Sequence, residues 1–163
     1  MSNEGSVTKK TEKLIALPHT AQNRCFGCGQ ANEGGLHLEF LLAEDGTVVS
    51  LPTVSDSFEG PHGYLHGGIL ATLLDEAMSK AVRALGVTAM TRQMEVEYLR
   101  PVPSATPIRI EGDVTRNEGR KHWAEARILN EKAVTLATGK GLFVEVRASR
   151  MTAGQSGDRP AED

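Results

Sequence analysis

Several features that define whole classes of protein are missing from this chain of 163 residues. No apolar run approaches the roughly 18 residues of a membrane-spanning helix, and the polar N-terminus lacks the apolar core of a signal peptide. Positive charge is not in excess either, because the formal net charge is −3 and the pI is about 6.0. These absences argue against membrane partners, secretion and general binding to nucleic acid, and they predict a cytoplasmic protein.

Cysteine is nearly absent, and the only two cysteines lie in one turn, Asn23-Arg24-Cys25-Phe26-Gly27-Cys28-Gly29. A structural zinc site usually needs four ligands, and a second cysteine pair is missing, although His19 and His37 are nearby in the sequence. A thioredoxin-like redox pair should open a helix, whereas two glycines suggest a tight turn. We therefore favour a structural turn with reduced thiols, leave metal binding and redox chemistry as alternatives, and expect no metal and no organic cofactor.

The length and composition suit one folded domain with a real core. The chain is 39% hydrophobic and 24% charged, as is usual for globular proteins, and it contains no internal repeats. We expect residues 1–20 to form a flexible N-terminal segment and residues 21–147 to form the domain. Residues 148–163 have too little apolar content to fold, so a disordered tail is predicted there.

One long helix is the clearest element of the sequence. No proline or glycine interrupts the segment from Ile69 to Leu85, and Gly86 is placed to end it. Glu76 and Lys80 are four residues apart on a flank that we expect to be solvated. A broad apolar face suited to burial against a sheet contains Ile69, Leu70, Leu73, Leu74, Ala77, Met78, Ala81, Ala84 and Leu85.

Asp75 lies on the other flank of this helix, among small and apolar neighbours and without a cation at helical spacing. An isolated aspartate is usually just exposed. Here, however, His66-Gly67-Gly68 comes directly before the helix, and glycines at a helix start leave backbone N–H groups free to bind a carbonyl oxygen or an anion. The combination favours a functional site.

Strands account for most of the remaining sequence. Alternating or apolar segments predict strands at 36–42, 47–51, 89–100, 108–115, 121–129 and 134–146, with 52–65 as a loop. In the third of these strands, Met90, Met94, Val96 and Tyr98 should face one way, and Thr91, Gln93, Glu95 and Glu97 the other. One helix cannot cover both faces of such a sheet. The sequence therefore predicts an α+β fold in which an antiparallel sheet of about six strands wraps around one long central helix.

The pattern of His-Gly-Gly, six residues and then Asp75, with a polar strand about fifteen residues later, resembles the hotdog-fold acyl-CoA thioesterases. It is most similar to the phenylacetyl-CoA thioesterase-like branch of the 4-hydroxybenzoyl-CoA thioesterase superfamily. The resemblance extends over residues 25–146 and is most specific at 60–101. It implies the hotdog fold and hydrolysis of a small, medium-chain or aromatic acyl-CoA.

The resemblance also implies roles for individual residues. Asp75 matches the acidic residue that acts as general base or nucleophile, Gly67 the oxyanion amide, and His66 the residue that orients the turn. Thr91 matches a hydroxyl that helps to hold the attacking water. Gly68 is given no role by this match, but its amide at the helix start makes it a candidate for substrate binding.

Other candidates lie near this motif or on a turn. Some relatives have Asn or Gln six residues before the histidine, where this chain has Gly60, so this helper is missing or is replaced by His62. His62 is either a general base or a solvated loop residue. Arg120 and Lys121 follow a turn and are candidates for binding the phosphates of coenzyme A, or else form a solvated hairpin tip.

Helix geometry separates the two main catalytic candidates. Gly67 and Asp75 are eight residues apart, so they lie about 12 Å from each other along one helix. One carbonyl group cannot touch both. Two subunits with antiparallel helices would bring Gly67 of one chain opposite Asp75 of the other, and the resemblance implies the same arrangement. We therefore predict a homodimer with interfacial active sites, which can pair further into a dimer of dimers.

Two other functions remain open. A hotdog dehydratase or hydratase would pair His62 or His66 with Glu76, but Glu76 is expected on the solvated flank. A non-catalytic acyl-CoA-binding protein on the same fold is disfavoured by the intact Asp75 beside His66-Gly67-Gly68. The fold alone does not decide among the three.

Overall fold

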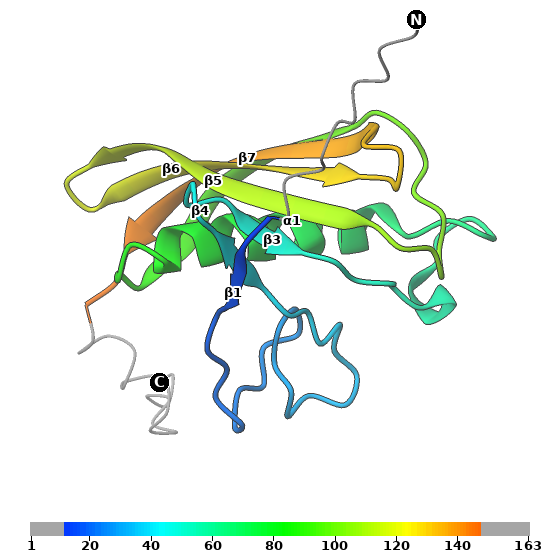
Figure 1. The fold of residues 1–163 in the computed structure, drawn as a ribbon, viewed down its shortest axis with the longest axis horizontal. Helices are drawn as coiled ribbons and strands as arrows, with labels where there is room; N and C mark the ends of the chain where they lie inside the picture. The colour runs from blue at the N-terminus through cyan, green and yellow to red at the C-terminus, as the bar shows by residue number, and fades with distance from the viewer. Residues whose placement is uncertain (1–11, 148–163) are drawn as a thin grey trace, which may run out of the picture.

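The computed structural model describes residues 12–147, and it contains one long helix and seven strands in that range. The helix α1 spans Gly67–Arg83, and a short 3-10 helix η1 spans Asp56–Phe58. The strands are β1 (Leu14–Ala16), β2 (Leu41–Ala43), β3 (Val48–Ser50), β4 (Ala89–Tyr98), β5 (Arg109–Glu118), β6 (Lys121–Leu129) and β7 (Thr135–Glu145). Figure 1 shows α1 crossing one face of the sheet.

All strands belong to one antiparallel sheet with the order β1-β2-β3-β5-β6-β7-β4. The strand that directly follows the helix, β4, is therefore added to the far edge beside the last strand, β7. The α+β hotdog architecture predicted from the sequence is confirmed. It has one strand more than expected, because β1 pairs with β2.

Glycines let α1 lie unusually close to the sheet. Gly112 of β5 faces Ala77, and Gly139 of β7 faces Leu74 and Met78. These glycines share one row of the sheet, since Gly112 pairs with Ala126 and Ala126 pairs with Gly139. Most of the apolar face predicted for the helix is buried over this row, and Leu73, Leu74, Ala77 and Met78 are fully buried. The prediction was wrong for its C-terminal end, where Ala84 and Leu85 are exposed because the helix ends there.

The ends of α1 differ little from the prediction. The helix starts at Gly67, two residues earlier than expected, because His66 caps it. It ends with Ala84 as the C-cap, and Gly86 follows with a φ of +84°. A left-handed glycine after a helix is a common terminator, so the predicted role of Gly86 is confirmed.

The N-terminal segment differs from the expectation of a flexible region at 1–20. Leu14–Ala16 forms β1, and Leu17 packs against the core. The reason is that three apolar residues can pair with the short strand β2 at a sheet edge.

Residues 1–11 and the predicted tail at 148–163 lie outside the described residues. Between residues 12 and 147, no helix has the length and apolar character needed to cross a membrane.

The contact between α1 and Gly112 generates a stability prediction. A Cβ atom at Gly112 would lie 2.5 Å from the carbonyl oxygen of Ala77, which belongs to the helix backbone. We expect Gly112→Ala to lower the free energy of unfolding by about 1–3 kcal/mol, because the helix must move away from the sheet. Urea unfolding measures this.

Gly34→Ala is the matched control, because the nearest atom to its added Cβ would be 3.8 Å away. We expect this variant to stay within about 0.5 kcal/mol of the parent protein. Equal effects at the two positions would show that close helix contact is not what requires glycine at residue 112.

Candidate active site

The first turn of α1 has one backbone amide that is left without a partner. His66 is the N-cap, and the Gly68 N–H donates to its Nδ1 atom (2.9 Å). The expectation that the Gly68 amide is open to a substrate was therefore wrong, because the capping side chain occupies it. The N–H groups of Ile69 and Leu70 donate to the His66 carbonyl oxygen. Among the described residues, no acceptor bonds the N–H of Gly67. This amide points out of the positive end of the helix and is suited to bind an oxyanion.

His66 is held in place by its own backbone and by Gly60. The backbone N–H of His66 donates to the carbonyl oxygen of Phe58 (3.0 Å). A Cβ atom at Gly60 would lie 3.2 Å from the Cα of His66 and 3.3 Å from its ring. A side chain at position 60 would therefore require His66, which caps the helix, to shift by a few tenths of an ångström.

His62 lies on the same loop but points into solvent. Its Nδ1 is 3.5 Å from Oε2 of Glu59, and its side chain is fully exposed. Glu59 also accepts a hydrogen bond from the Ser104 hydroxyl, which holds the pKa of this carboxyl below its ordinary value. Within one chain, the structure therefore joins His62 to Glu59 rather than to Asp75.

Asp75 and Thr91 do meet. The Thr91 hydroxyl donates to Oδ1 of Asp75 at 2.7 Å. Burial raises the pKa of the half-buried Asp75 carboxyl above its ordinary value, the hydrogen bond from Thr91 lowers it, and the charge of Glu76 raises it further. A carboxylate that is partly withdrawn from water and fixed by one hydroxyl is suited to act as a base or a nucleophile.

A β-bulge in β4 brings Thr91 to this position. The sequence pattern placed Thr91 on the polar face with Gln93 and Glu95, and this expectation was wrong. The register shifts between Thr91 and Gln93, so Arg92 is an extra residue in the strand. As a result, Thr91 faces the helix on the same side as Met94 and Val96. Met90, predicted to share that side, is 53% exposed.

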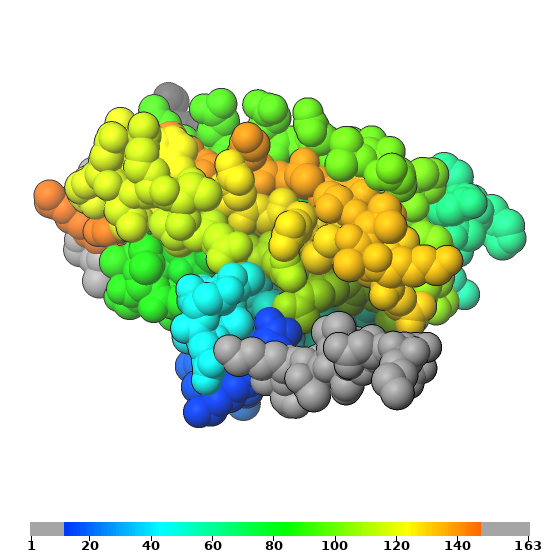
Figure 2. Space-filling model, turned by 45° about the horizontal axis from the view of Figure 1, so that its top comes forward, coloured from blue at the N-terminus to red at the C-terminus, as the bar shows by residue number. Residues whose placement is uncertain are grey.

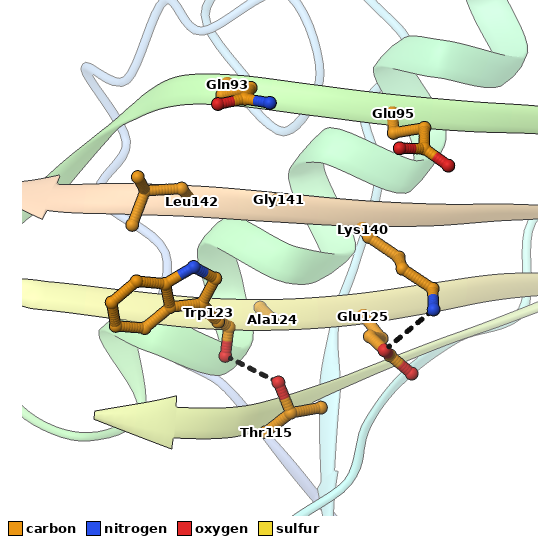
Figure 3. Close-up of a pocket in the computed structure, with 9 residues that line it drawn as sticks. All are labelled: Gln93, Glu95, Thr115, Trp123, Ala124, Glu125, Lys140, Gly141 and Leu142. Carbon is orange, nitrogen blue, oxygen red and sulfur yellow. Dashed lines mark hydrogen bonds and ion pairs between the residues drawn. The ribbon is translucent and has the colours of Figure 1, made fainter. Parts of the chain in front are cut away.

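The polar residues Gln93 and Glu95 line a shallow hollow on the outer face of the sheet, away from α1 (Figure 3). Trp123 and Leu142 contribute its apolar part, and an ion pair of 3.5 Å joins Lys140 to Glu125. Figure 2 shows this outer face, with β6 and β7 (yellow to orange) across it and β4 (green) along its upper edge. The hollow is separated from the Asp75 carboxylate by the sheet.

The two candidate groups on α1 are tied to opposite ends of β4. At one end, the Tyr98 hydroxyl donates to the carbonyl oxygen of Gly67 (3.1 Å). At the other end, Thr91 bonds Asp75. Gly67 and Asp75 both belong to α1, so their eight-residue separation corresponds to about 12 Å along the helix axis. Tyr98 was not identified as a site residue from the sequence, because a strand tyrosine with apolar neighbours is usually a packing residue.

Arg120 and Lys121 lie beyond the Asp75 end of β4. Arg120 donates to the carbonyl oxygen of Glu145, which pairs with Ala89 at the start of β4. Lys121 is exposed at the same hairpin. The structure places both cations far along the sheet from Gly67 and does not bring them to the helix N-terminus of their own chain.

The Glu76 flank of the helix is not solvated as expected. Glu76 is half-buried, and its Oε1 accepts a hydrogen bond from the Cys25 thiol at 3.2 Å. The turn containing both cysteines lies over this flank, which sequence periodicity alone cannot reveal. Burial and the charge of Glu76 raise the pKa of the Cys28 thiol to about 11.

The helix start, Asp75 and Thr91 all lie in the part of the chain that matches a known family. Residues 62–137 match the family model described as "Thioesterase superfamily". A solved protein from that superfamily is 31% identical, with a TM-score of 0.61, and the match covers 69% of this chain and 86% of the other. The chain belongs to the thioesterase superfamily.

Other similar proteins give a consistent result. The solved structure of another thioesterase superfamily protein has a TM-score of 0.71 at 29% identity, and the match covers 75% of this chain and 60% of that one. The acyl-coenzyme A thioesterase THEM4 of Bos taurus is 28% identical over 138 residues, which are 82% of this chain and 56% of the bovine protein. The chain thus spans little more than half of that relative.

The capping role of His66 can be tested through stability. We expect His66→Ala to lower the free energy of unfolding by about 1 kcal/mol, because the Gly68 N–H loses its acceptor. His66→Asn supplies another good capping side chain and should recover most of this loss. Chemical unfolding monitored by circular dichroism measures both variants, and an Asn variant as unstable as the Ala variant would contradict the role.

Proposed function

We propose that this protein is an acyl-CoA thioesterase. The observation that carries the proposal is the combination on one helix of a free amide at Gly67 and a carboxylate at Asp75 held by Thr91. Thioester hydrolysis needs both elements: a group that activates water or attacks the carbonyl carbon, and a donor for the developing oxyanion. The thioesterase superfamily and the name of the bovine relative support the same reaction and an acyl-CoA substrate.

In the proposed reaction, the thioester carbonyl oxygen accepts a hydrogen bond from the Gly67 N–H. Asp75 either takes a proton from water as the water attacks the carbonyl carbon, or attacks that carbon itself. Thr91 holds the carboxylate and helps to position the water. Collapse of the tetrahedral intermediate releases the thiol, which receives a proton, and leaves the acid. If Asp75 attacks, water must then hydrolyse the resulting anhydride.

The reaction requires two subunits, because Gly67 and Asp75 of one chain cannot reach the same carbonyl. We propose a homodimer in which the edge strands β4 pair antiparallel and the helices of the two chains run in opposite directions. The edge position of β4 and its length of ten residues support this arrangement. Each active site then contains Gly67 of one chain and Asp75 of its partner, giving two equivalent sites.

Substrate binding follows from the same geometry. We propose that Gly68 and Gly60 shape the turn around His66, and that His62 at the exposed loop contacts the substrate. Arg120 and Lys121 are the candidates for the phosphates of coenzyme A. Their position beyond the Asp75 end of β4 supports a role in the site that uses Asp75 of the same chain. The outer sheet face is the surface where two dimers would pair.

A dehydratase is less consistent with the contacts. It would need Glu76 beside a histidine, yet Glu76 accepts from Cys25, and His66 caps the helix ten residues earlier. Ten residues of helix correspond to about 15 Å. No described contact brings Glu76 to His62 or His66.

Free-thiol release from short, medium-chain, long and aromatic acyl-CoA substrates tests the proposal. The parent protein should hydrolyse at least one substrate, and Asp75→Asn should lose most of that rate, about 100-fold or more, because the amide can neither accept a proton nor attack as a carboxylate does. The variant must remain folded. Binding of acyl-CoA without thiol release by the parent protein would overturn the enzyme and favour a binding module.

Mixing two inactive variants tests the shared site. Gly67→Pro removes the amide hydrogen, and proline is well tolerated at the first position of a helix. Asp75→Asn removes the carboxylate. A dimer containing one chain of each retains one intact site, so co-refolding equal amounts should recover about a quarter of the parent rate if chains assort at random.

Gly67→Ala is the control for this experiment, because it keeps the N–H and its Cβ would be 3.6 Å from the Tyr98 ring, an ordinary contact. It should retain far more activity than Gly67→Pro. Absence of recovery in the mixed sample, with dimers verified by light scattering, would show that each site is built within one chain.

A further inference from the structure

The turn at Cys25 and Cys28 has a geometry that only glycine permits. The Gly29 N–H donates to the carbonyl oxygen of Cys25 (2.8 Å), which closes the turn and directs both thiols to one side. A Cβ atom at Gly29 would lie 2.4 Å from the backbone nitrogen of Cys25. The sequence offered only these two thiols and two histidines as ligand candidates. The structure brings a further candidate ligand to the two thiols from a distant part of the chain, as the third member of the group.

That third group is Glu76 of α1, which is 51 residues from Cys25 in sequence. A Cβ atom at Gly27 would lie 2.2 Å from Cγ of Glu76, so the observed position of the Glu76 side chain beside the turn is compatible only with glycine between the cysteines. The Cys25 Sγ lies 3.2 Å from Oε1 of Glu76. One ligand atom from each of Cys25, Cys28 and Glu76 lies within 4.8 Å of the other two.

We propose that Cys25, Cys28 and Glu76 bind one divalent transition metal ion of the zinc class. Tetrahedral ligands at zinc, with bonds of about 2.0–2.3 Å, stand about 3.5 Å from one another. The observed separations require only small movements to reach this geometry. Two thiolates select zinc-like metals over magnesium or calcium, and solvent completes the coordination. Nothing in this assignment depends on the thioesterase proposal.

Charge supports the same assignment. Two thiolates and one carboxylate around a divalent ion leave a net charge of −1. Lys80 lies one helical turn after Glu76, and its positive charge acts on Cys28. The Lys80 ammonium group would neutralise the remaining negative charge of the metal and its three ligands. The side-chain amide of Asn23 also donates to Cys28 Sγ (3.5 Å), as a group around a metal-bound sulfur does.

Metal binding would replace the proton between Cys25 and Glu76 and release both thiol protons to solvent. The ion would then join the cysteine turn to α1. The same turn already holds the extended segment before β2, since the N–H groups of Leu36 and Leu38 donate to the carbonyl oxygens of Phe26 and Gly27. The proposed site therefore fastens the cysteine turn, and the extended segment before β2 that it holds, to the central helix, one residue from Asp75.

Cobalt binding to the reduced, metal-free full-length protein tests this site. Thiolate-to-cobalt charge-transfer absorption should saturate at one cobalt per chain, and zinc should displace the cobalt. Cys28→Ser should lose most of the absorption. Glu76→Gln should keep both thiols but bind cobalt at least about tenfold more weakly, since even groups outside the ligand set affect affinity about 10–100-fold. Glu95→Gln, on the outer sheet face, is the matched control and should bind normally.

The cobalt titration also separates a metal site from a redox pair. Absence of charge-transfer absorption in the folded, reduced parent protein would overturn the proposal. Equal cobalt affinity in Glu76→Gln and the control would overturn the role of Glu76. Should Cys28→Ser fail to fold, Cys25→Ser and Glu76→Gln still test the site. Purified protein whose two thiols are joined as a disulfide and that binds no cobalt after reduction would instead identify a redox pair.

Discussion

The close approach of α1 to the sheet is the constraint on which the rest of the structure depends. Gly112 and Gly139 leave the strands without side chains where Ala77, Leu74 and Met78 press against them. Side chains on both flanks of this helix contact neighbouring segments. The flank that carries Asp75 reaches β4, and the flank that carries Glu76 reaches the cysteine turn. A helix held farther from the sheet would lose the contact with β4, because that contact depends on the short side chains of Asp75 and Thr91.

Strand β4 connects the two halves of the proposed catalytic apparatus. Its inner face contacts the helix N-terminus through Tyr98 and the middle of the helix through Thr91. Both contacts require an inward-facing side chain, yet 91 and 98 differ by an odd number of residues. A regular strand would direct them to opposite faces. The bulge at Arg92 resolves this conflict, and it does so at the sheet edge, where an extra residue disrupts only one ladder.

Local patterns were sufficient to predict most of the fold. The apolar period of α1, the glycine after it and the alternating strands each act over a few residues, and the resemblance supplied the hotdog arrangement. The resemblance named both Asp75 and Thr91 as candidate site residues, but it did not predict that their side chains meet. For Thr91 the reasoning from strand alternation was wrong, because a bulge has no signal in a simple period of two. Strand β1 and the contact between Cys25 and Glu76 depend on pairing between distant segments, which sequence spacing does not encode.

Asp75 and Glu76 show how neighbouring carboxylates acquire different chemistry. They are adjacent in sequence and about 100° apart around the helix, so different segments cover them. Asp75 faces a hydroxyl from β4, and none of the cations between residues 12 and 147 pairs with it, which leaves a half-buried carboxylate suited to react with a substrate or with water. Glu76 faces two thiols and lies one turn before Lys80, which leaves a carboxylate suited to bind a metal. Because the charge of Glu76 also acts on Asp75, anything that neutralises one carboxylate alters the electrostatic environment of the other.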